Sequence, residues 1–323
     1  MNEQALLELR NVSKEYRVGA LLLKRTIRAV NNVTFKIPRE AYAIALIGES
    51  GSGKTTIAKM ILGLLKPTSG EILYRGRNIS EWIRKNKLEY YREVQPIFQD
   101  PYSVYNPVYR IDRILKVTAK KFKLAKTKEE MRSLITKALE DVGLRPEDVL
   151  GRYPHQLSGG ERQRIMLARI LMLKPRLIVA DEPVSMIDVS LRASFLEKLR
   201  EFKEKMGISC LYISHDLHSA SYLADTIIVL YRGCIVEEGP MEKVLSEPLH
   251  PYTQQLLSSI PIPNPKQRWK EQVNLATLEA VSALGRGCPF YVRCPHAMER
   301  CSQEAPQLKE LEDGRKVSCF LYY

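Results

Sequence analysis

The stretch Gly48-Glu49-Ser50-Gly51-Ser52-Gly53-Lys54-Thr55 decides the fold of this chain. It fits the pattern G-x-x-x-x-G-K-S/T in full and stands between an apolar run at 42–47 and a helical pattern at 56–65. In this strand-loop-helix context, loop N–H groups and the positive end of the helix dipole surround a phosphate chain. We expect Lys54 to neutralise the β- and γ-phosphates of ATP, and Thr55 to place a hydroxyl on Mg²⁺. The other residues expected to line this site are Gly48, Ser50, Gly51, Gly53 and Thr56. The weaker alternative is a glycine-rich turn with an incidental lysine.

Short apolar runs alternate with helical patterns along the rest of the chain. The runs at 42–47, 177–180 and 210–213 are typical of parallel strands that are buried on both faces. After Ser190, apolar residues recur with helical spacing as far as Met206. Strands that alternate with helices predict an α/β sheet. Two further runs, separated by Arg232-Gly233, predict a hairpin at the end of that sheet.

A pair of acids and a histidine follow two of the predicted strands. Asp181 and Glu182 come directly after the run at 177–180, where ligands of open α/β sheets bind. We expect Asp181 to hold Mg²⁺ and Glu182 to polarise the water that attacks the γ-phosphate. His215 ends the next strand and could contact the γ-phosphate or that water. Taken alone, acids at such a position more often cap a helix, and a histidine there more often makes a structural hydrogen bond.

Composition describes a globular chain with a basic surface. Of 323 residues, 45% are hydrophobic and 27% are charged, and no apolar stretch approaches the roughly 18 residues of a membrane span. No secretory signal opens the chain, so we expect a cytosolic protein that reaches a membrane only through partners. The net charge of +13 fits a solvated surface or proximity to an anionic membrane leaflet. Nucleic-acid binding is disfavoured, because the basic residues are scattered and no nucleic-acid motif is present.

The segment Leu157-Ser158-Gly159-Gly160-Glu161-Arg162-Gln163-Arg164 closely resembles the signature motif of ABC ATPases. It also fits a capping box, with Ser158 as N-cap and Glu161 three residues later, and the two interpretations are compatible. The resemblance implies that the helix tip at Ser158 and Gly160 meets the γ-phosphate bound by an opposite subunit. A complete ATP site would then need two chains.

The same resemblance gives roles to other residues. Gln99 resembles the Q-loop glutamine, which senses Mg²⁺ and the γ-phosphate and connects to the membrane subunit. His215 resembles the H-loop histidine. Asp188 resembles the D-loop aspartate, although Ser185-Met186-Ile187-Asp188 replaces the usual Ser-Ala-Leu-Asp. Tyr16 resembles the aromatic residue that stacks on adenine, although a tyrosine in a strand can also serve packing alone.

Three further segments resemble the oligopeptide/dipeptide branch of ABC importers, with the likeness closest to DppF/OppF-like ATPase subunits. They are Asn106-Pro107, His250-Pro251-Tyr252-Thr253 and Gly287-Cys288-Pro289-Phe290. The resemblance implies a second ATPase subunit, DppD/OppD-like, two transmembrane permeases and an extracellular solute-binding protein. It also implies a peripheral position on the cytoplasmic face of the membrane. The solute stays open, because some members of the branch carry oligosaccharides.

Four cysteines gather near the end of the chain, at Cys288, Cys294, Cys301 and Cys319. Four thiolates in a short cytosolic segment indicate a metal or a cluster. The close C-x-x-C pairs of most zinc sites are absent, which favours a [4Fe-4S] cluster, and similar tails in this family bind one. A bound Zn²⁺ and unliganded thiols remain possible outcomes. His296 could replace one ligand, although the favoured interpretation is an exposed neighbour of the cysteines.

The expected architecture is a P-loop ABC ATPase domain over residues 1–265. It has an antiparallel N-terminal β-subdomain and a helical insertion at about 81–156. The proline-rich stretch 260–265 predicts a boundary, and residues 266–323 form the cysteine-bearing tail. The rival function is a soluble ABC ATPase of DNA repair or translation. No coiled coil and no second cassette are visible to support it.

Overall fold

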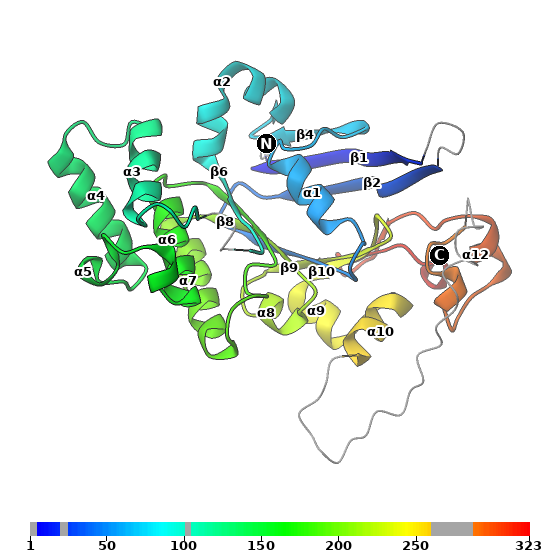
Figure 1. Cartoon of the computed structure of the whole chain (residues 1–323). Helices are drawn as coiled ribbons and strands as arrows, with labels where there is room; N and C mark the ends of the chain where they lie inside the picture. The colour runs from blue at the N-terminus through cyan, green and yellow to red at the C-terminus, as the bar shows by residue number, and fades with distance from the viewer. Residues whose placement is uncertain (1–4, 20–24, 101–104, 260–286) are drawn as a thin grey trace, which may run out of the picture.

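Two β-sheets frame the molecule in the computed structural model, which describes residues 5–19, 25–100, 105–259 and 287–323. The smaller sheet is antiparallel, with the order β2-β1-β4-β5 (Figure 1). Its strands are β1 (Leu7–Val18), β2 (Arg25–Ile37), β4 (Ser69–Tyr74) and β5 (Arg77–Asn78). The larger sheet has the order β11-β12-β10-β9-β3-β8-β7-β6. The predicted α/β core and its antiparallel β-subdomain are therefore both present.

Five parallel strands form the centre of the larger sheet. They are β3 (Ala43–Ile47), β6 (Val94–Ile97), β7 (Leu177–Asp181), β8 (Ser209–Ser214) and β9 (Thr226–Tyr231). Every residue of β3 and of β8 is buried, as their continuous apolar runs predict. Ile47 is in register with Ser214, and Asp181 with Ile213. The residues that follow these strands therefore meet at one edge of the sheet.

The predicted hairpin is confirmed, since β9 pairs antiparallel with β10 (Cys234–Pro240). Helix α1 (Lys54–Ile61) ends four residues before its predicted limit. Gly63 has φ 68°, and the N–H groups of Leu64 and Leu65 both bond to the carbonyl of Lys59, which closes the helix. Helix α7 (Val189–Met206) buries Phe195, while Met206 in its last turn is 49% exposed.

The interval 81–156 is not one helical insertion. It begins in α2 (Ile79–Glu93) and then contains β6, whose four residues pair in parallel with β7. A four-residue segment such as Val94–Ile97 can complete a sheet only when a partner strand is available, which the local pattern did not reveal. Beyond β6 the helices are α3 (Asp112–Lys121), α4 (Lys128–Asp141), α5 (Pro146–Val149), η1 (Pro154–Gln156) and α6 (Gly159–Leu171).

The last part of the chain joins the larger sheet. After α8 (Leu217–Ser221) come α9 (Met241–Ser246) and α10 (Pro251–Ser258); from Gly287 onward the structure describes η2 (Tyr291–Arg293), α12 (Glu299–Gln303), β11 (Lys309–Glu310), β12 (Lys316–Val317) and η3 (Phe320–Tyr322). Strand β12 pairs with β10, where Val317 faces Glu237. The predicted extended segment 260–265, with its boundary, lies outside the described residues, and the division there stays a prediction.

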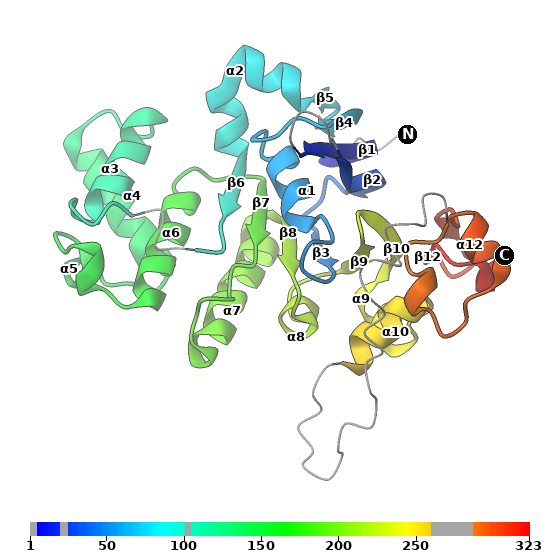
Figure 2. The same cartoon turned by 45° about the vertical axis from the view of Figure 1, so that its right-hand side comes forward.

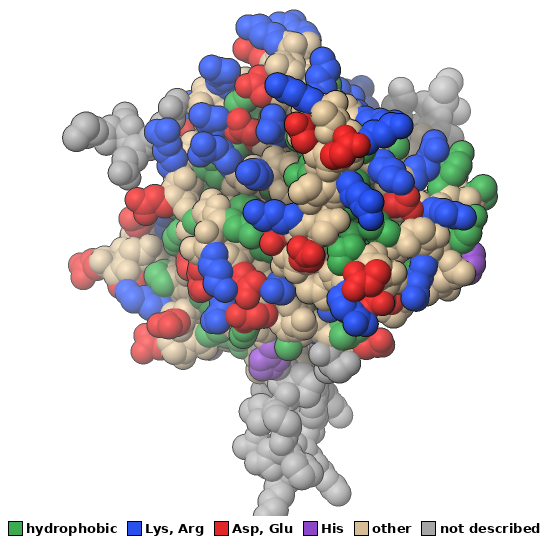
Figure 3. Space-filling view, turned by 90° about the vertical axis from the view of Figure 1, so that its left-hand side faces the viewer, with side chains coloured by type: hydrophobic (Ala, Val, Ile, Leu, Met, Phe, Trp, Pro, Cys, Tyr) green, Lys and Arg blue, Asp and Glu red, His purple; other side chains and the backbone are tan. Residues whose placement is uncertain are grey.

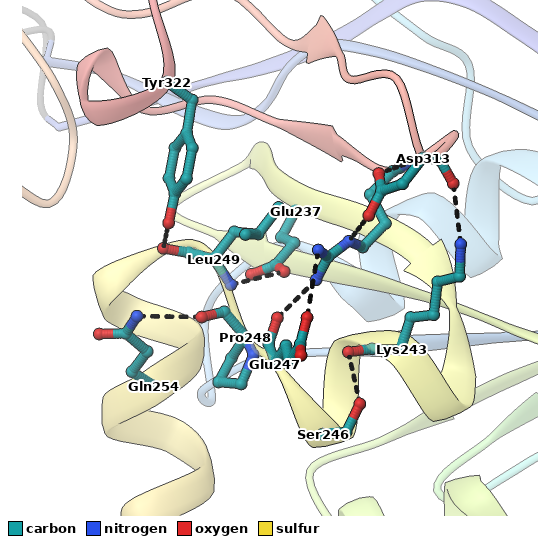
Figure 4. Close-up of polar contacts among 10 residues, drawn as sticks. Glu237, Lys243, Ser246, Glu247, Pro248, Leu249, Gln254, Asp313 and Tyr322 are labelled. Carbon is teal, nitrogen blue, oxygen red and sulfur yellow. Dashed lines mark hydrogen bonds and ion pairs between the residues drawn. The ribbon is translucent and has the colours of Figure 1, made fainter.

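The seam between this tail and the ATPase core is polar and closely bonded (Figure 4). Glu237 is completely buried, and one of its carboxylate oxygens accepts the backbone N–H of Leu249 at 2.9 Å. The Tyr322 hydroxyl donates to the carbonyl of Leu249 at 2.9 Å, and Lys243 donates to the carbonyl of Asp313 at 3.1 Å. Burial raises the pKa of Glu237. A carboxylate so deeply buried needs such donors, and the backbone N–H groups of Leu249 and His250 supply them. The bonds made by Tyr322 and Asp313 join the tail to the core.

The two ends of the molecule are formed by different parts of the chain. Helices α3, α4 and α5 lie at one end and the tail lies at the other, in both views of the chain (Figures 1 and 2). On the face seen in Figure 3, Lys and Arg side chains are interspersed with Asp and Glu. None of the helices that the structure describes is long and apolar enough to cross a membrane.

Candidate functional site

The phosphate loop wraps around the ammonium of Lys54. This side chain is buried, and its Nζ donates to the carbonyl of Gly48 at 2.6 Å and to that of Glu49 at 2.8 Å. Burial lowers the pKa of Lys54, while the nearby carboxylates of Glu182 and Asp181 act in the opposite direction. The cation therefore sits at the centre of the loop, where a phosphate chain would meet it.

Close contacts with two strands explain two of the loop's glycines. At Gly53, φ is 107°, and an added Cβ would lie 2.3 Å from the carbonyl oxygen of Ala29 in β2. At Gly48, an added Cβ would lie 2.1 Å from the carbonyl oxygen of Leu230 in β9. Real Cβ atoms do not come so close to backbone, so both positions require glycine. The loop therefore packs between β2 of the antiparallel subdomain and β9 of the central sheet.

One cavity of about 720 Å³ gathers most of the predicted site. Its size is that of a small-molecule site, and residues from five separate segments of the chain line it. The lining consists of Ala29, Ser50, Gly51, Gly53, Lys54, Thr55, Thr56, Gln99, Glu182 and His215. The phosphate loop, the glutamine, the second acid and the histidine are thus neighbours in space.

Oxygen ligands for a magnesium ion stand beside the loop. The Thr55 hydroxyl donates to Oδ1 of Asp181 at 3.3 Å, across the gap between α1 and the end of β7. Burial raises the pKa of Asp181, while the bond from Thr55 and the charge of Lys54 lower it. A hydroxyl and a carboxylate are ligands that Mg²⁺ prefers, and phosphates and waters usually complete its shell. The residues present therefore fit this ion.

Glu182 and His215 form a hydrogen-bonded pair at the edge of the cavity. Nδ1 of His215 lies 2.8 Å from Oε2 of Glu182, and the histidine side chain is 66% exposed. Glu182 has φ 51°, an uncommon conformation for a non-glycine residue, and its N–H donates to the carbonyl of Ile213 at 2.9 Å. Such backbone strain persists where surrounding bonds impose it, often at reactive sites. Here β8 imposes it.

The signature helix begins with the predicted capping box. The N–H of Glu161 donates to Oγ of Ser158 at 3.2 Å, and the N–H of Ser158 donates to Oε2 of Glu161 at 2.7 Å. Neither Ser158 nor Gly160 lines the cavity of this chain. Asp188, at the N-cap position of α7, is exposed and also lies outside that lining.

Tyr16 is also apart from the lining of the cavity. It lies near the end of β1, opposite Ile27 of β2, and is 38% exposed. The Lys14 ammonium stands 5.5 Å from the centre of its ring. Its stacking on adenine stays a prediction.

Two contacts of the site escaped the sequence interpretation. The buried Gln163 of α6 donates from Nε2 to the carbonyl of Pro183 at 2.9 Å, which ties the signature helix to the segment after Glu182. The N–H of Glu49 donates to the hydroxyl of Tyr252 at 2.9 Å. A glutamine on the buried side of a helix was a usable signal for the first contact. No local signal existed for the second.

The four tail cysteines line one small pocket. Its lining includes Cys288, Cys294, Cys301 and Cys319, with His250 and Phe290. Burial raises the pKa of Cys288 to about 11, and the three other thiols add to the shift. Within the described ranges, no group of three or more Cys, His, Asp or Glu side chains is arranged to hold a metal ion. The predicted gathering of thiols is present, but a metal site is not shown.

Comparisons with known proteins agree with this geometry. Residues 30–185 match the family described as ABC transporter, and residues 236–301 match the C-terminal region of oligopeptide/dipeptide transporters. The putative oligopeptide transport ATP-binding protein YkfD of Bacillus subtilis is 41% identical over 324 residues, which cover 100% of this chain and 97% of that protein. The chain belongs to the oligopeptide/dipeptide branch of the ABC transporter ATPases.

Other members of the family extend the likeness. The dipeptide transport ATP-binding protein DppF of Haemophilus influenzae is 38% identical over 322 residues, covering 98% of this ABC ATPase and 96% of that protein. A solved dimer of the ATP-binding cassette MJ0796, bound to ADP and Pi, has a TM-score of 0.64 and 27% identity. It covers 73% of this chain and 98% of its own. ATP hydrolysis for transport is the activity of this family.

Proposed function

We propose that this chain is the ATP-binding and hydrolysing subunit that powers an importer of oligopeptides or dipeptides. One observation carries the proposal: Lys54, Gln99, Glu182 and His215 line a single cavity. The peptide assignment is supported by full-length relatives that are named as oligopeptide or dipeptide transport ATP-binding proteins. Those names disfavour both an oligosaccharide importer and a soluble ATPase of repair or translation.

The proposed mechanism uses the side chains around the cavity in distinct ways. Thr55, Asp181 and Gln99 would hold Mg²⁺, which neutralises charge on the phosphates when bound. Glu182 accepts a proton from the water that attacks the γ-phosphate. His215 holds the Glu182 carboxylate from the exposed side at 2.8 Å and limits its freedom to turn away. Lys54 offsets the negative charge of the transferred group.

A second ATPase chain is required by the same proposal. Ser158, Gly160 and Asp188 lie outside the cavity of their own chain, so we infer that they face ATP held by a partner. The cassette MJ0796, with a similar fold, was solved as a dimer. We propose a related, DppD/OppD-like chain as the partner. ATP would bind the closed dimer more tightly than the open one, and hydrolysis would reopen it.

The closing motion would act on two permease subunits at the cytoplasmic face of a membrane, with an extracellular solute-binding protein supplying the peptide. Co-purification from solubilised membranes tests this assembly. Recovery of the chain with two hydrophobic permeases supports it. Recovery only from the soluble fraction, free of both permeases, contradicts it.

Replacing Glu182 by glutamine tests the catalytic role. The amide keeps the size of the side chain but cannot accept a proton, so ATP turnover should fall by roughly 10²–10⁴-fold while MgATP binding persists. The ATP-loaded dimer should then remain closed and elute as the larger species in gel filtration. Glu197→Gln, a change on α7 outside the lining of the cavity, is the matched control. Unchanged turnover in the Glu182 variant would reject this residue as the base.

For the tail, residues 266–323, we propose a [4Fe-4S] cluster bound by Cys288, Cys294, Cys301 and Cys319. Support comes from the four thiols that line one pocket. Iron and acid-labile sulfide in anaerobically purified protein are the expected result. Stoichiometric zinc without iron, or four free thiols, contradicts the cluster.

A further inference from the structure

A residue of the cysteine-bearing tail reaches the phosphate loop. Arg293 ends η2, next to Cys294, and its guanidinium donates two hydrogen bonds to the carboxylate of Glu49, at 3.1 and 3.0 Å. The pair joins residues 244 positions apart in the chain. Two parallel N–H···O bonds between Arg and a carboxylate combine charge with a fixed orientation. The contact therefore specifies both where Glu49 points and what charge faces it.

Glu49 occupies the second position of the loop that wraps Lys54. Its carbonyl accepts a hydrogen bond from the Lys54 ammonium at 2.8 Å, and its N–H donates to the hydroxyl of Tyr252 in α10 at 2.9 Å. The backbone of Glu49 is thus part of the phosphate loop, while its carboxylate is turned toward Arg293. A change in the partner or charge of the Glu49 carboxylate therefore acts on a residue whose backbone carbonyl bonds to Lys54.

The position of Arg293 is determined by packing in the tail. Phe290, 1% exposed, packs against Tyr231 and Tyr252 with ring centres 5.3 and 5.5 Å apart. The guanidinium lies 5.8 Å from the Tyr231 ring and also donates to Gln255 at 3.3 Å. Hydrogen bonds from Tyr322 to the carbonyl of Leu249 and from Lys243 to the carbonyl of Asp313 hold the tail against the core (Figure 4). Arg293 is therefore presented to the loop by a well-packed segment.

The charges at this contact have a consequence for nucleotide binding. A triphosphate brings several negative charges to the loop, and the carboxylate of Glu49 is one more negative charge beside it. Arg293 is 25% exposed and pairs with that carboxylate, which offsets its repulsion of the phosphates. Without the guanidinium, the repulsion would act on the incoming nucleotide.

We propose that Arg293 is a positioning residue of the ATP site, which neutralises Glu49 and holds the phosphate loop in its binding conformation. This inference rests on the proposed ATPase function. It makes nucleotide affinity depend on the folding of the tail, and by linkage it makes nucleotide binding stabilise the tail. Cys294, one of the four cysteines that line the tail pocket, directly follows Arg293, so this pocket adjoins the residue that contacts the phosphate loop.

A charge-compensation cycle tests the proposal on the full-length protein. Isothermal titration measures the dissociation constant of MgADP for the wild type, Arg293→Met, Glu49→Gln and the double variant. Arg293→Met should weaken binding about three- to fivefold, as expected for a partly exposed ion pair. The double variant should recover to within about twofold of Glu49→Gln, because no carboxylate remains to be neutralised.

The matched control is Arg300→Met, which removes another tail arginine paired with Glu304, and it should leave MgADP affinity unchanged. Arg293→Lys keeps the charge without the double bond and should fall between the wild type and Arg293→Met. Unchanged affinity in Arg293→Met, or a double variant as weak as Arg293→Met, overturns the inference. If Arg293→Met does not fold, Arg293→Lys decides alone: affinity below that of the wild type supports the inference, and affinity equal to the wild type overturns it. A wild type that does not bind MgADP refutes the proposed function instead.

Discussion

Replacing Gly53 by alanine should damage the phosphate loop more than the same change at another glycine of positive φ. At Gly53 the new methyl group would lie 2.3 Å from the carbonyl oxygen of Ala29, so the loop or β2 must move. The left-handed backbone costs about 1–2 kcal/mol for an L-residue, and the overlap adds about 1–3 kcal/mol. We therefore expect a total loss of about 2–5 kcal/mol in the free energy of unfolding.

Gly143→Ala supplies the control for the backbone term alone. Gly143 has φ 73°, and an added Cβ would meet no atom within 4 Å. That variant should lose only this backbone term, about 1–2 kcal/mol. Urea unfolding of both proteins without nucleotide measures the difference, and titration with MgADP measures its effect on the site.

Gly53→Ala should bind MgADP more than tenfold more weakly than the wild type, because displacement of the loop moves the N–H groups that face the phosphates. Gly143→Ala should bind normally. Equal destabilisation of the two variants would refute the steric argument. Normal affinity in Gly53→Ala would refute the claim that the contact with Ala29 shapes the site.

Other predictions separate stability from function. Ser158→Ala and Thr127→Ala each remove an N-cap hydrogen bond and should each lower the free energy of unfolding by about 1 kcal/mol. Only Ser158→Ala should slow ATP turnover of the assembled transporter. Equal turnover in the two variants would leave Ser158 with a capping role alone. Tyr16→Ala should weaken ATP binding about tenfold if the ring stacks on adenine. The free energy of unfolding should change little, because Tyr16 is 38% exposed. Titration with ATP measures the affinity, and an unchanged value assigns Tyr16 to the strand surface. Burial raises the pKa of Asp181, so the ionised carboxylate opposes folding. The favourable contribution of the protonated carboxyl to stability is complete below the unfolded-state pKa and is lost as pH rises through the folded-state pKa. Asp181→Asn should therefore be more stable than the wild type at pH 8 in EDTA, with a gap in urea unfolding that narrows toward pH 4, and parallel pH profiles would contradict this.

The site could be predicted from sequence where its geometry is local. A glycine-rich loop between a strand and a helix, an acid pair after a second strand and a capping box each depend on a few neighbouring residues. Because parallel strands end at one edge of a sheet, these local patterns also implied that Lys54, Glu182 and His215 would meet, and all three line one cavity.

The errors arose where a local pattern needed a distant partner or an overlooked stop signal. Strand β6 depends on pairing with β7, some 80 positions later, and its four residues give little signal by themselves. The early end of α1 follows from Gly63, whose positive φ could have been anticipated from its identity. The tail cysteines do gather in one pocket, but their spacing could not show how closely the sulfur atoms approach one another.

The amino-acid sequence by itself determined the phosphate loop, the reactive residues at the strand ends beside it and the membership of the family, because backbone conformation and residue chemistry at short range are sufficient for these. Only the tertiary structure decided that Gln163 bonds to the carbonyl of Pro183 and that Arg293 pairs with Glu49. Such contacts arise when packed elements bring remote segments together. Helical spacing can place Gln163 on a buried face, but nothing along the chain identifies its partner or that of Arg293.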